Sequence, residues 1–257
     1  MENRIKTACF RFYAYLNELL PREDRHKVVR VLFKGRQSVK HLIESCGVPH
    51  TEVDLILVNG ASADLTYIMQ GGEYISVYPH FYQLPIPNGK RNQQPQTDTL
   101  FFIADGHLGQ LARYLRMLGF DTFYKNEIAD AVLAEISENE RRILLTRDRG
   151  LLKRKMVEFG CLIRYLDPLD QLRQVAKRYN LMKVCQPFSR CIVCNGILEP
   201  VKKQDILHLL EPKTKKFFTI FKQCALCGKI YWAGSHMAYM NKIIENLKEI
   251  SNKKEFI

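Results

Sequence analysis

The sequence has no run of about 18 consecutive apolar residues, the length that a membrane-spanning helix requires. Its first twenty residues, MENRIKTACFRFYAYLNELL, mix charges with apolar side chains and lack the apolar stretch of a signal peptide. No internal repeat recurs at the period of a solenoid. These absences argue against a membrane partner and a repeat array, and they predict a cytoplasmic globular protein.

Acidic residues are also scarce, because 27 Asp and Glu stand against 39 Lys and Arg, for a formal net charge of +12. Such an excess favours an anionic partner, with nucleic acid as the first candidate. A protein that is positive only to remain soluble would have the same composition. Charge alone therefore leaves both interpretations open.

Residues 1–84 have the pattern of one small α+β domain. Predicted strands lie at 5–13, 28–33, 54–58 and 74–79, with a helix at 38–47 between the second and third strands. Ser38 can cap the helix and Gly47 can end it. The order strand, strand, helix, strand, strand predicts a ubiquitin-like β-grasp domain.

Residues 85–98, PIPNGKRNQQPQTD, contain three prolines and no apolar cluster, which predicts a linker. Strands then alternate with helices over 99–184. The predicted strands are 100–104, 121–124, 143–146 and 161–166, and the helices are 106–119, 129–139, 149–157 and 169–179. This alternation predicts an α/β domain with a parallel sheet.

The chain carries Cys191-x-x-Cys194 and, further on, Cys224-x-x-Cys227. Each pair sets two thiolates on a tight turn, and Zn²⁺ prefers four such sulfur ligands in a tetrahedron. The sequence therefore predicts a structural zinc site in a zinc ribbon, and this ribbon and a C-terminal helix together occupy 185–257. The other cysteines are expected to be small buried apolar residues without disulfides: Cys9, Cys46, Cys161 and Cys185.

Two aspartates follow predicted strands of the α/β domain. Asp105 comes directly after the strand at 100–104, and Asp148 comes just after the strand at 143–146. Ligands bind at the carboxyl edge of an open parallel sheet, so both carboxylates can converge there. Their mutual repulsion would be relieved by Mg²⁺ or Mn²⁺, which prefer oxygen ligands. Asp130 could reach the same edge, or it could simply complement the dipole of the helix that it opens.

Arginines lie close to these acids in the sequence. Four of them are candidates for binding substrate phosphate: Arg113, Arg116, Arg147 and Arg149. Ion pairing with the same carboxylates is the simpler interpretation for any one of them. The zinc module contains lysines together with aromatic rings, a composition that suits single-stranded RNA or DNA. Phe217 and Phe218, however, are expected to belong to the small core of the ribbon.

Four stretches form a specific set: FIADGHLGQLARYLRMLGFDT, RILLTRDRGLL, RCIVCNG and CALCGKIYWAGSHMAYM. This part of the chain resembles the RNase domain first described at the end of the Mut-seven exonuclease, a branch of the PIN-like nucleases. The resemblance implies a metal-dependent ribonuclease on a PIN-like fold with a zinc ribbon. Its catalytic acids would fall on Asp105, Asp130 and Asp148. Many PIN-like proteins carry a further acid near the position of Gly150, and this chain departs from that pattern.

Residues 5–82 contain RFYAYLNELLP, SVKHLIESCGVPHTEVDLILVNG and ISVYP, and they resemble the ubiquitin-like domain often fused ahead of that RNase domain. The domain resembles the sulfur-carrier type of β-grasp fold, but Gly71-Gly72 is internal here rather than C-terminal. Docking of a protein or of RNA is therefore the preferred expectation for this domain. Three hypotheses remain: an endoribonuclease, a non-catalytic RNA-binding or ribosome-associated adaptor, and a sulfur carrier.

Overall fold

The computed structural model describes residues 4–80 and 100–252. The chain divides into two compact units. One unit combines Met1–Thr97 with Ala129–Leu162, and the other combines Asp98–Ile128 with Ile163–Ile257. The predicted linker at 85–98 lies outside the described residues, and the domain boundaries drawn from the sequence stay predictions.

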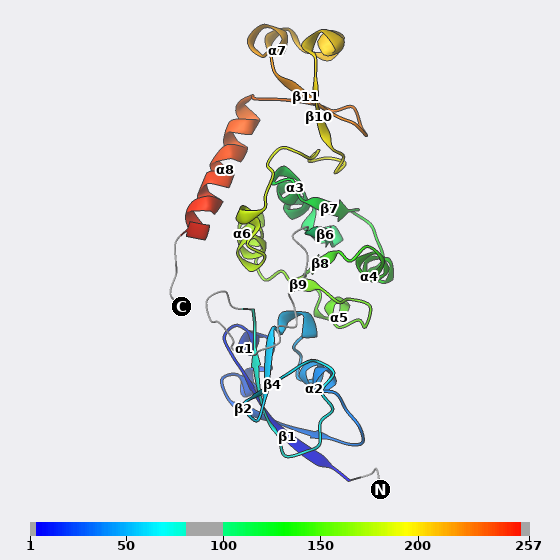
Figure 1. Cartoon of the computed structure of the whole chain (residues 1–257), viewed down its shortest axis with the longest axis vertical. Helices are drawn as coiled ribbons and strands as arrows, with labels where there is room; N and C mark the ends of the chain where they lie inside the picture. The colour runs from blue at the N-terminus through cyan, green and yellow to red at the C-terminus, as the bar shows by residue number, and fades with distance from the viewer. Residues whose placement is uncertain (1–3, 81–99, 253–257) are drawn as a thin grey trace. The chain divides into compact units, whose positions relative to one another are not determined.

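The N-terminal domain is a five-stranded mixed sheet with the predicted β-grasp architecture (Figure 1). Its strand order is β2-β1-β5-β3-β4, in which β1 runs antiparallel to β2 and parallel to β5. The strands are β1 (Lys6–Phe12), β2 (Val28–Phe33), β3 (Leu55–Val58), β4 (Ala61–Ala63) and β5 (Tyr74–Tyr78). The helical elements are α1 (Leu16–Leu19), η1 (Arg22–Asp24), α2 (Val39–Ser45) and η2 (His50–Glu52).

Local sequence explains these elements. Alternate residues of β1, ending with Phe10 and Phe12, are buried, as expected for a strand with one face on the core. The Ser38 hydroxyl accepts a hydrogen bond from the His41 backbone N–H and so caps α2. Strand β4 was not predicted, because its three short side chains carry no apolar pattern.

The central domain contains a four-stranded parallel sheet in the order β7-β6-β8-β9. Its strands are β6 (Phe101–Ala104), β7 (Asp121–Tyr124), β8 (Ile143–Thr146) and β9 (Gly160–Leu162). Its helical elements are η3 (Gly106–Leu108), α3 (Gly109–Met117), α4 (Asp130–Asn139), α5 (Arg149–Leu152) and α6 (Pro168–Arg178). The predicted α/β architecture is confirmed.

Two of its elements are shorter than predicted. Helix α5 stops at Leu152, because the polar residues that follow offer no apolar side chain to the core before Val157. Strand β9 stops at Leu162, and the chain beyond it exposes Tyr165 and Leu166 to solvent. The predictions of a helix to 157 and a strand to 166 were therefore wrong at these ends.

The C-terminal part contains a small antiparallel sheet and a long helix. Strands β10 (Leu198–Val201), β11 (Phe221–Cys224) and β12 (Ile230–Trp232) lie in the order β10-β11-β12. The helical elements are η4 (Leu181–Lys183), η5 (Lys203–Leu209), α7 (Pro212–Phe217) and α8 (Ser235–Asn252). We call residues 190–234 the cysteine ribbon. Within the described part of the chain, no helix has the length and apolar character needed to cross a bilayer.

Candidate metal centres and their surroundings

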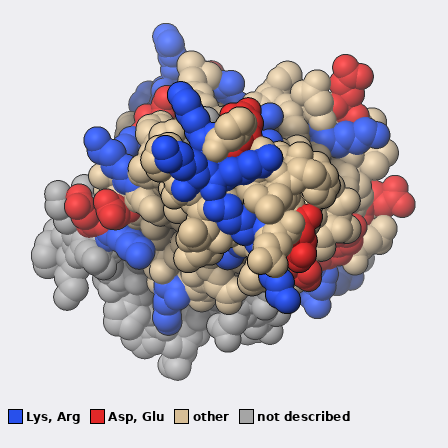
Figure 2. All heavy atoms as spheres, turned by 90° about the horizontal axis from the view of Figure 1, so that it is seen from above, with Lys and Arg blue, Asp and Glu red and all other residues tan. Residues whose placement is uncertain are grey.

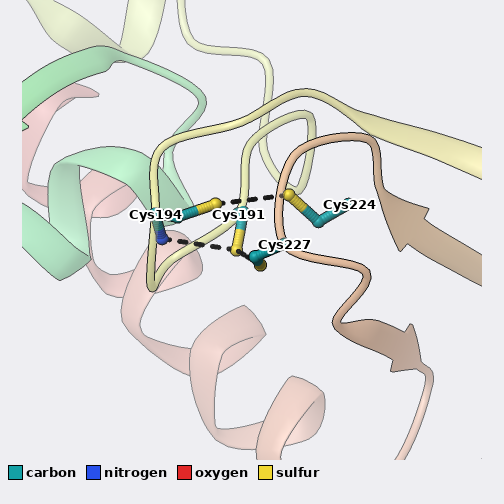
Figure 3. A group of neighbouring side chains, drawn as sticks. All are labelled: Cys191, Cys194, Cys224 and Cys227. Carbon is teal, nitrogen blue, oxygen red and sulfur yellow. Dashed lines mark hydrogen bonds between the residues drawn. The ribbon is translucent and has the colours of Figure 1, made fainter.

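The four cysteines of the ribbon form one cluster. Their sulfur atoms all lie within 4.8 Å of one another. The side chains of the two Cys-x-x-Cys turns point toward each other, with Sγ–Sγ distances of 3.7 Å for Cys191–Cys227 and 3.3 Å for Cys194–Cys224 (Figure 3). Four sulfurs bound to zinc at about 2.3 Å would lie about 3.8 Å apart, so the cluster fits a tetrahedral zinc ion.

The two turns are built in the same way. The N–H of Asn195 donates to the Cys191 carbonyl at 2.9 Å, and the N–H of Gly228 donates to the Cys224 carbonyl at 3.0 Å. Asn195 and Gly228 both adopt a left-handed conformation, with φ of 72° and 71°. Asn and Gly are the residues that tolerate this conformation best, which explains their presence four positions after the first cysteine of each turn.

The surroundings of Cys191 favour the thiolate. Burial alone would raise its pKa, but hydrogen bonds from the Tyr231 hydroxyl and from the Cys194 backbone N–H lower the pKa to about 6. The Tyr231 oxygen lies 3.0 Å from Cys191 Sγ. Because a metal binds the thiolate rather than the thiol, this environment favours Cys191 as a ligand. Burial raises the pKa of its neighbour Cys194, so Cys194 keeps its proton more strongly until a cation displaces it.

The remaining cysteines are not part of this cluster, and none of the eight forms a disulfide. Cys161 is buried as predicted. Cys9, Cys46 and Cys185 are only half-buried, so the expectation that all four would be interior residues was too simple.

Arg116 joins the first cysteine turn to the α/β domain. Its side chain, on α3, is only 5% exposed, and burial lowers the pKa of its guanidinium group. Nη1 donates to the carbonyls of Val193 at 2.7 Å and Ile192 at 3.4 Å, and Nε donates to the Thr122 carbonyl at 3.0 Å. These contacts support a structural role for Arg116, which holds the first cysteine turn against α3. We therefore propose no contact of Arg116 with substrate, although the sequence predicted one.

Asn195 forms a second link between the same two regions. Its side-chain oxygen accepts from the Thr122 N–H at 3.0 Å, and its Nδ2 donates to Asp121 at 2.9 Å. Asp121 also pairs with Arg190 at 3.1 Å. The sequence did not point to either contact, because nothing in the local pattern of Asp121 or Asn195 indicates partners so distant along the chain.

The three candidate aspartates lie at the ends of elements. Asp105 follows β6 directly and occupies the N-cap position of η3. Asp148 follows β8 and caps α5, with its Oδ1 accepting from the Gly150 N–H at 2.6 Å. Asp130 is the exposed first residue of α4. Asp167, by comparison, caps α6 by accepting from the N–H groups of Leu169 and Asp170.

Strands β6 and β8 are neighbours in the sheet order, so Asp105 and Asp148 each follow one of two adjacent strands. Over residues 4–80 and 100–252, however, only the four cysteines form a group of three or more metal-ligating side chains within 4.8 Å. A joint magnesium or manganese site of Asp105, Asp130 and Asp148 therefore stays a prediction.

The other candidate arginines have exposed side chains: Arg113, Arg147 and Arg149. Arg149 also donates from Nη1 to the Leu19 carbonyl of the β-grasp domain at 2.8 Å. His107, which follows Asp105 by two residues and so lies near the same end of β6, is also exposed. Phe218 packs against the buried cluster of Ile206, Leu210 and Phe221 as expected, but Phe217 is 68% exposed and its assignment to the core was wrong.

A β-grasp domain, a parallel α/β sheet and a four-cysteine ribbon in this order define a multidomain protein. The sequence model described as Mut7-C RNAse domain matches residues 101–244, more than half of the chain. The chain therefore belongs to that family. A second model, described as Mut7-C ubiquitin, matches residues 5–84. Searches of curated proteins and of solved structures found no match.

Proposed function

We propose that this protein is a metal-dependent ribonuclease that hydrolyses phosphodiester bonds within RNA chains. The observation that carries the proposal is the match of residues 101–244 to the Mut7-C RNAse domain. The placement of Asp105 and Asp148 after neighbouring strands supports it, because ligands of parallel sheets bind at the carboxyl ends of the strands.

In this proposal Asp105 and Asp148 hold Mg²⁺ or Mn²⁺ through carboxylate oxygens, with Asp130 as a third acid near the attacking water. The divalent ion, when bound, supplies an activated water and neutralises charge on the scissile phosphate. Arg113, Arg147 and Arg149 would hold the phosphates on either side of the scissile bond. Arg149 would do so with the guanidinium nitrogens other than Nη1, which donates to the Leu19 carbonyl.

The four ribbon cysteines would bind one structural zinc ion, because their all-sulfur donor set and Sγ spacing suit zinc. Thiolates persist in a reducing compartment, which agrees with the cytoplasmic location expected from the sequence. The zinc is separate from the catalytic ion, since hard divalent cations prefer oxygen ligands.

The ribbon also offers a surface for RNA. Phe217 and Ile220 are 68% and 80% exposed, and Lys213 and Lys216 are exposed nearby. The Lys216 ammonium lies 5.6 Å from the centre of the Phe217 ring. In Figure 2, which views the protein from the α7 side of Figure 1, Lys and Arg side chains gather over the middle of the face. Exposed rings among lysines can stack on bases while the charges hold phosphates.

The test is a cleavage assay on labelled RNA with the purified full-length protein. Cleavage should require Mn²⁺ or Mg²⁺ and should be abolished in Asp105→Asn. A matched control is Asp170→Asn, since Asp170 lies in the first turn of α6 and pairs with Arg173. Equal cleavage by wild type and Asp105→Asn would reject the assignment.

One observation favours a second function, that of a non-catalytic RNA-binding adaptor. Asp148 Oδ1 already accepts the Gly150 N–H as the cap of α5. The family resemblance also puts Gly150 near the place where many PIN-like proteins have an acid. An adaptor would bind RNA with an affinity that falls steeply with salt and would show no metal-dependent cleavage.

A further inference from the structure

A polar segment of the β-grasp domain is buried. Element η2 contains His50, Thr51 and Glu52, and the Glu52 side chain is only 1% exposed. Charged side chains are almost never fully buried unless they are paired. The groups that pack over Glu52 and bond to it therefore show what this surface of the β-grasp domain binds.

The covering groups come from the RNAse domain within the same compact unit. Element η2 lies beside β9. The Glu52 carboxylate accepts from the Leu162 N–H at 2.8 Å through one oxygen and from the Tyr15 hydroxyl at 2.8 Å through the other. The His50 ring bridges Glu44 of its own domain at 2.7 Å and the Val157 carbonyl at 2.9 Å.

Two further contacts begin on or just after α5, the helix that Asp148 caps. Arg149 donates to the Leu19 carbonyl, and the Lys153 ammonium donates to the Glu44 carbonyl, each at 2.8 Å. The segment from α5 to β9 is thus bonded to the β-grasp domain at both ends.

The position of β9 explains why such a contact is needed. It is an edge strand of the sheet β7-β6-β8-β9, so the N–H and C=O groups on its outer side need partners from outside the sheet. Glu52 supplies an acceptor to the N–H of Leu162, the last residue of that strand.

We propose that η2 and the end of α2 form an intramolecular docking surface for the α5–β9 segment, with Glu52 as its central positioning residue. The partner of this surface is the RNAse domain of the same chain. The contact fixes the α5–β9 segment and, with it, the position of Asp148, which caps α5. An effect of this contact on RNA cleavage rests on the proposed function.

The test is amide hydrogen exchange on the full-length protein, followed by mass spectrometry of peptides that cover 157–163. In Glu52→Ala these peptides should exchange about tenfold faster or more, because a buried N–H loses its charged acceptor. Glu52→Gln keeps an oxygen acceptor and should restore exchange close to that of wild type.

The matched control is Glu73→Ala. Glu73 is also buried, but its carboxylate accepts from the N–H groups of Gln70 and Gly71 inside the β-grasp domain. Exchange in 157–163 should therefore respond to Glu52→Ala and not to Glu73→Ala. Equal acceleration by both variants, or no acceleration by Glu52→Ala, would overturn the proposal.

A second pair of variants tests the contact from the other side, should Glu52→Ala fail to fold. Lys153→Met removes the donor to Glu44, whereas Lys155→Met changes an exposed lysine two positions later. Only Lys153→Met should speed exchange in peptides that cover 44–54, and an unchanged rate would contradict the docking surface.

Cleavage supplies an independent readout. If the protein cuts RNA, Glu52→Ala should lower kcat with little change in KM, because Glu52 positions Asp148 and does not touch RNA. A change in KM alone would argue against this positioning role. If neither the wild type nor any variant cuts RNA, the proposed function fails. The hydrogen-exchange experiment still tests the docking surface in that case.

Discussion

The two candidate metal centres of this protein are specified in different ways. The cysteine cluster depends on two short turns, in each of which two ligands lie three residues apart and the backbone brings them together. The aspartate site depends on strand order, because Asp105 and Asp148 come from different strands and meet only if the sheet aligns them. Each pair of cysteines is therefore set by its own turn, and the ribbon has only to bring two pairs together. The aspartates have no such local unit, and their carboxylates repel one another unless a cation lies between them.

Removal of one cysteine from the four-cysteine site should have the largest effect on stability among the predicted variants. Cys191→Ser should abolish binding of about one zinc ion per chain and unfold the ribbon, since structural zinc contributes roughly 10–16 kcal/mol in zinc-finger peptides. Metal analysis and a melting curve provide the measurements. Cys185→Ser is the control, because Cys185 lies outside the cluster. Undiminished zinc with an unchanged melting curve in Cys191→Ser would remove Cys191 from the ligand set.

Neutralising an acid should break the other site and leave the first intact. Asp148→Asn keeps the cap on α5, because Asn caps as well as Asp, but it loses the charge that holds a cation. Cleavage should fall about 100-fold or more, the equivalent of about 3 kcal/mol of transition-state stabilisation, with zinc content unchanged. Asp167→Asn, at the cap of α6, should cut RNA like wild type. Full activity in Asp148→Asn would remove Asp148 from the proposed catalytic site, and absence of cleavage in the wild type would favour the adaptor.

The link between the ribbon and α3 can be tested by a pair of arginines on one helix. Arg116→Met leaves three main-chain carbonyls without their donor, so the free energy of unfolding should fall by about 2–4 kcal/mol. Arg113→Met, at an exposed position of the same helix, should change it by less than about 0.5 kcal/mol. Chemical denaturation gives both values, and equal values would show that the buried bonds of Arg116 contribute nothing.

The smallest expected effect concerns the RNA surface of the ribbon. Phe217→Ala should weaken binding of a single-stranded oligonucleotide by about 1–3 kcal/mol, the usual contribution of one stacked base. Fluorescence anisotropy at fixed salt measures it. Leu209→Ala, at another exposed apolar position of the ribbon, is the control and should bind like wild type. The same loss in both variants would argue against stacking.

Local signals in the sequence predicted most of the fold. Ser38 caps a helix and Gly47 and Gly119 end helices in left-handed conformations, as their residue types suggest. The strand at 143–146 was predicted at its observed bounds from its apolar side chains alone. The cysteine cluster was predicted from local signals too, since each pair of ligands lies close to its turn residue in the chain and the repeated Cys-x-x-Cys spacing marks the two pairs as partners.

What the sequence could not predict depends on distant main-chain partners. Arg116 bonds to carbonyls 76 and 77 positions away, and Glu52 bonds to an N–H 110 positions away. Any surface arginine or glutamate has the same local pattern, so burial by another domain leaves no trace in the neighbouring residues. Phe217 shows the converse, because an aromatic residue in a small ribbon suggested a core position that the structure gives to Phe218 and Phe221 instead.

The most direct test of the account is Mn²⁺ binding to the full-length, zinc-loaded protein, followed by electron paramagnetic resonance of the free ion. Wild type should bind Mn²⁺ at a site that weakens at least about tenfold in Asp105→Asn and, separately, in Asp148→Asn, because each variant removes one anionic ligand. Unchanged Mn²⁺ affinity in both variants would contradict the claim that these two aspartates share a catalytic cation.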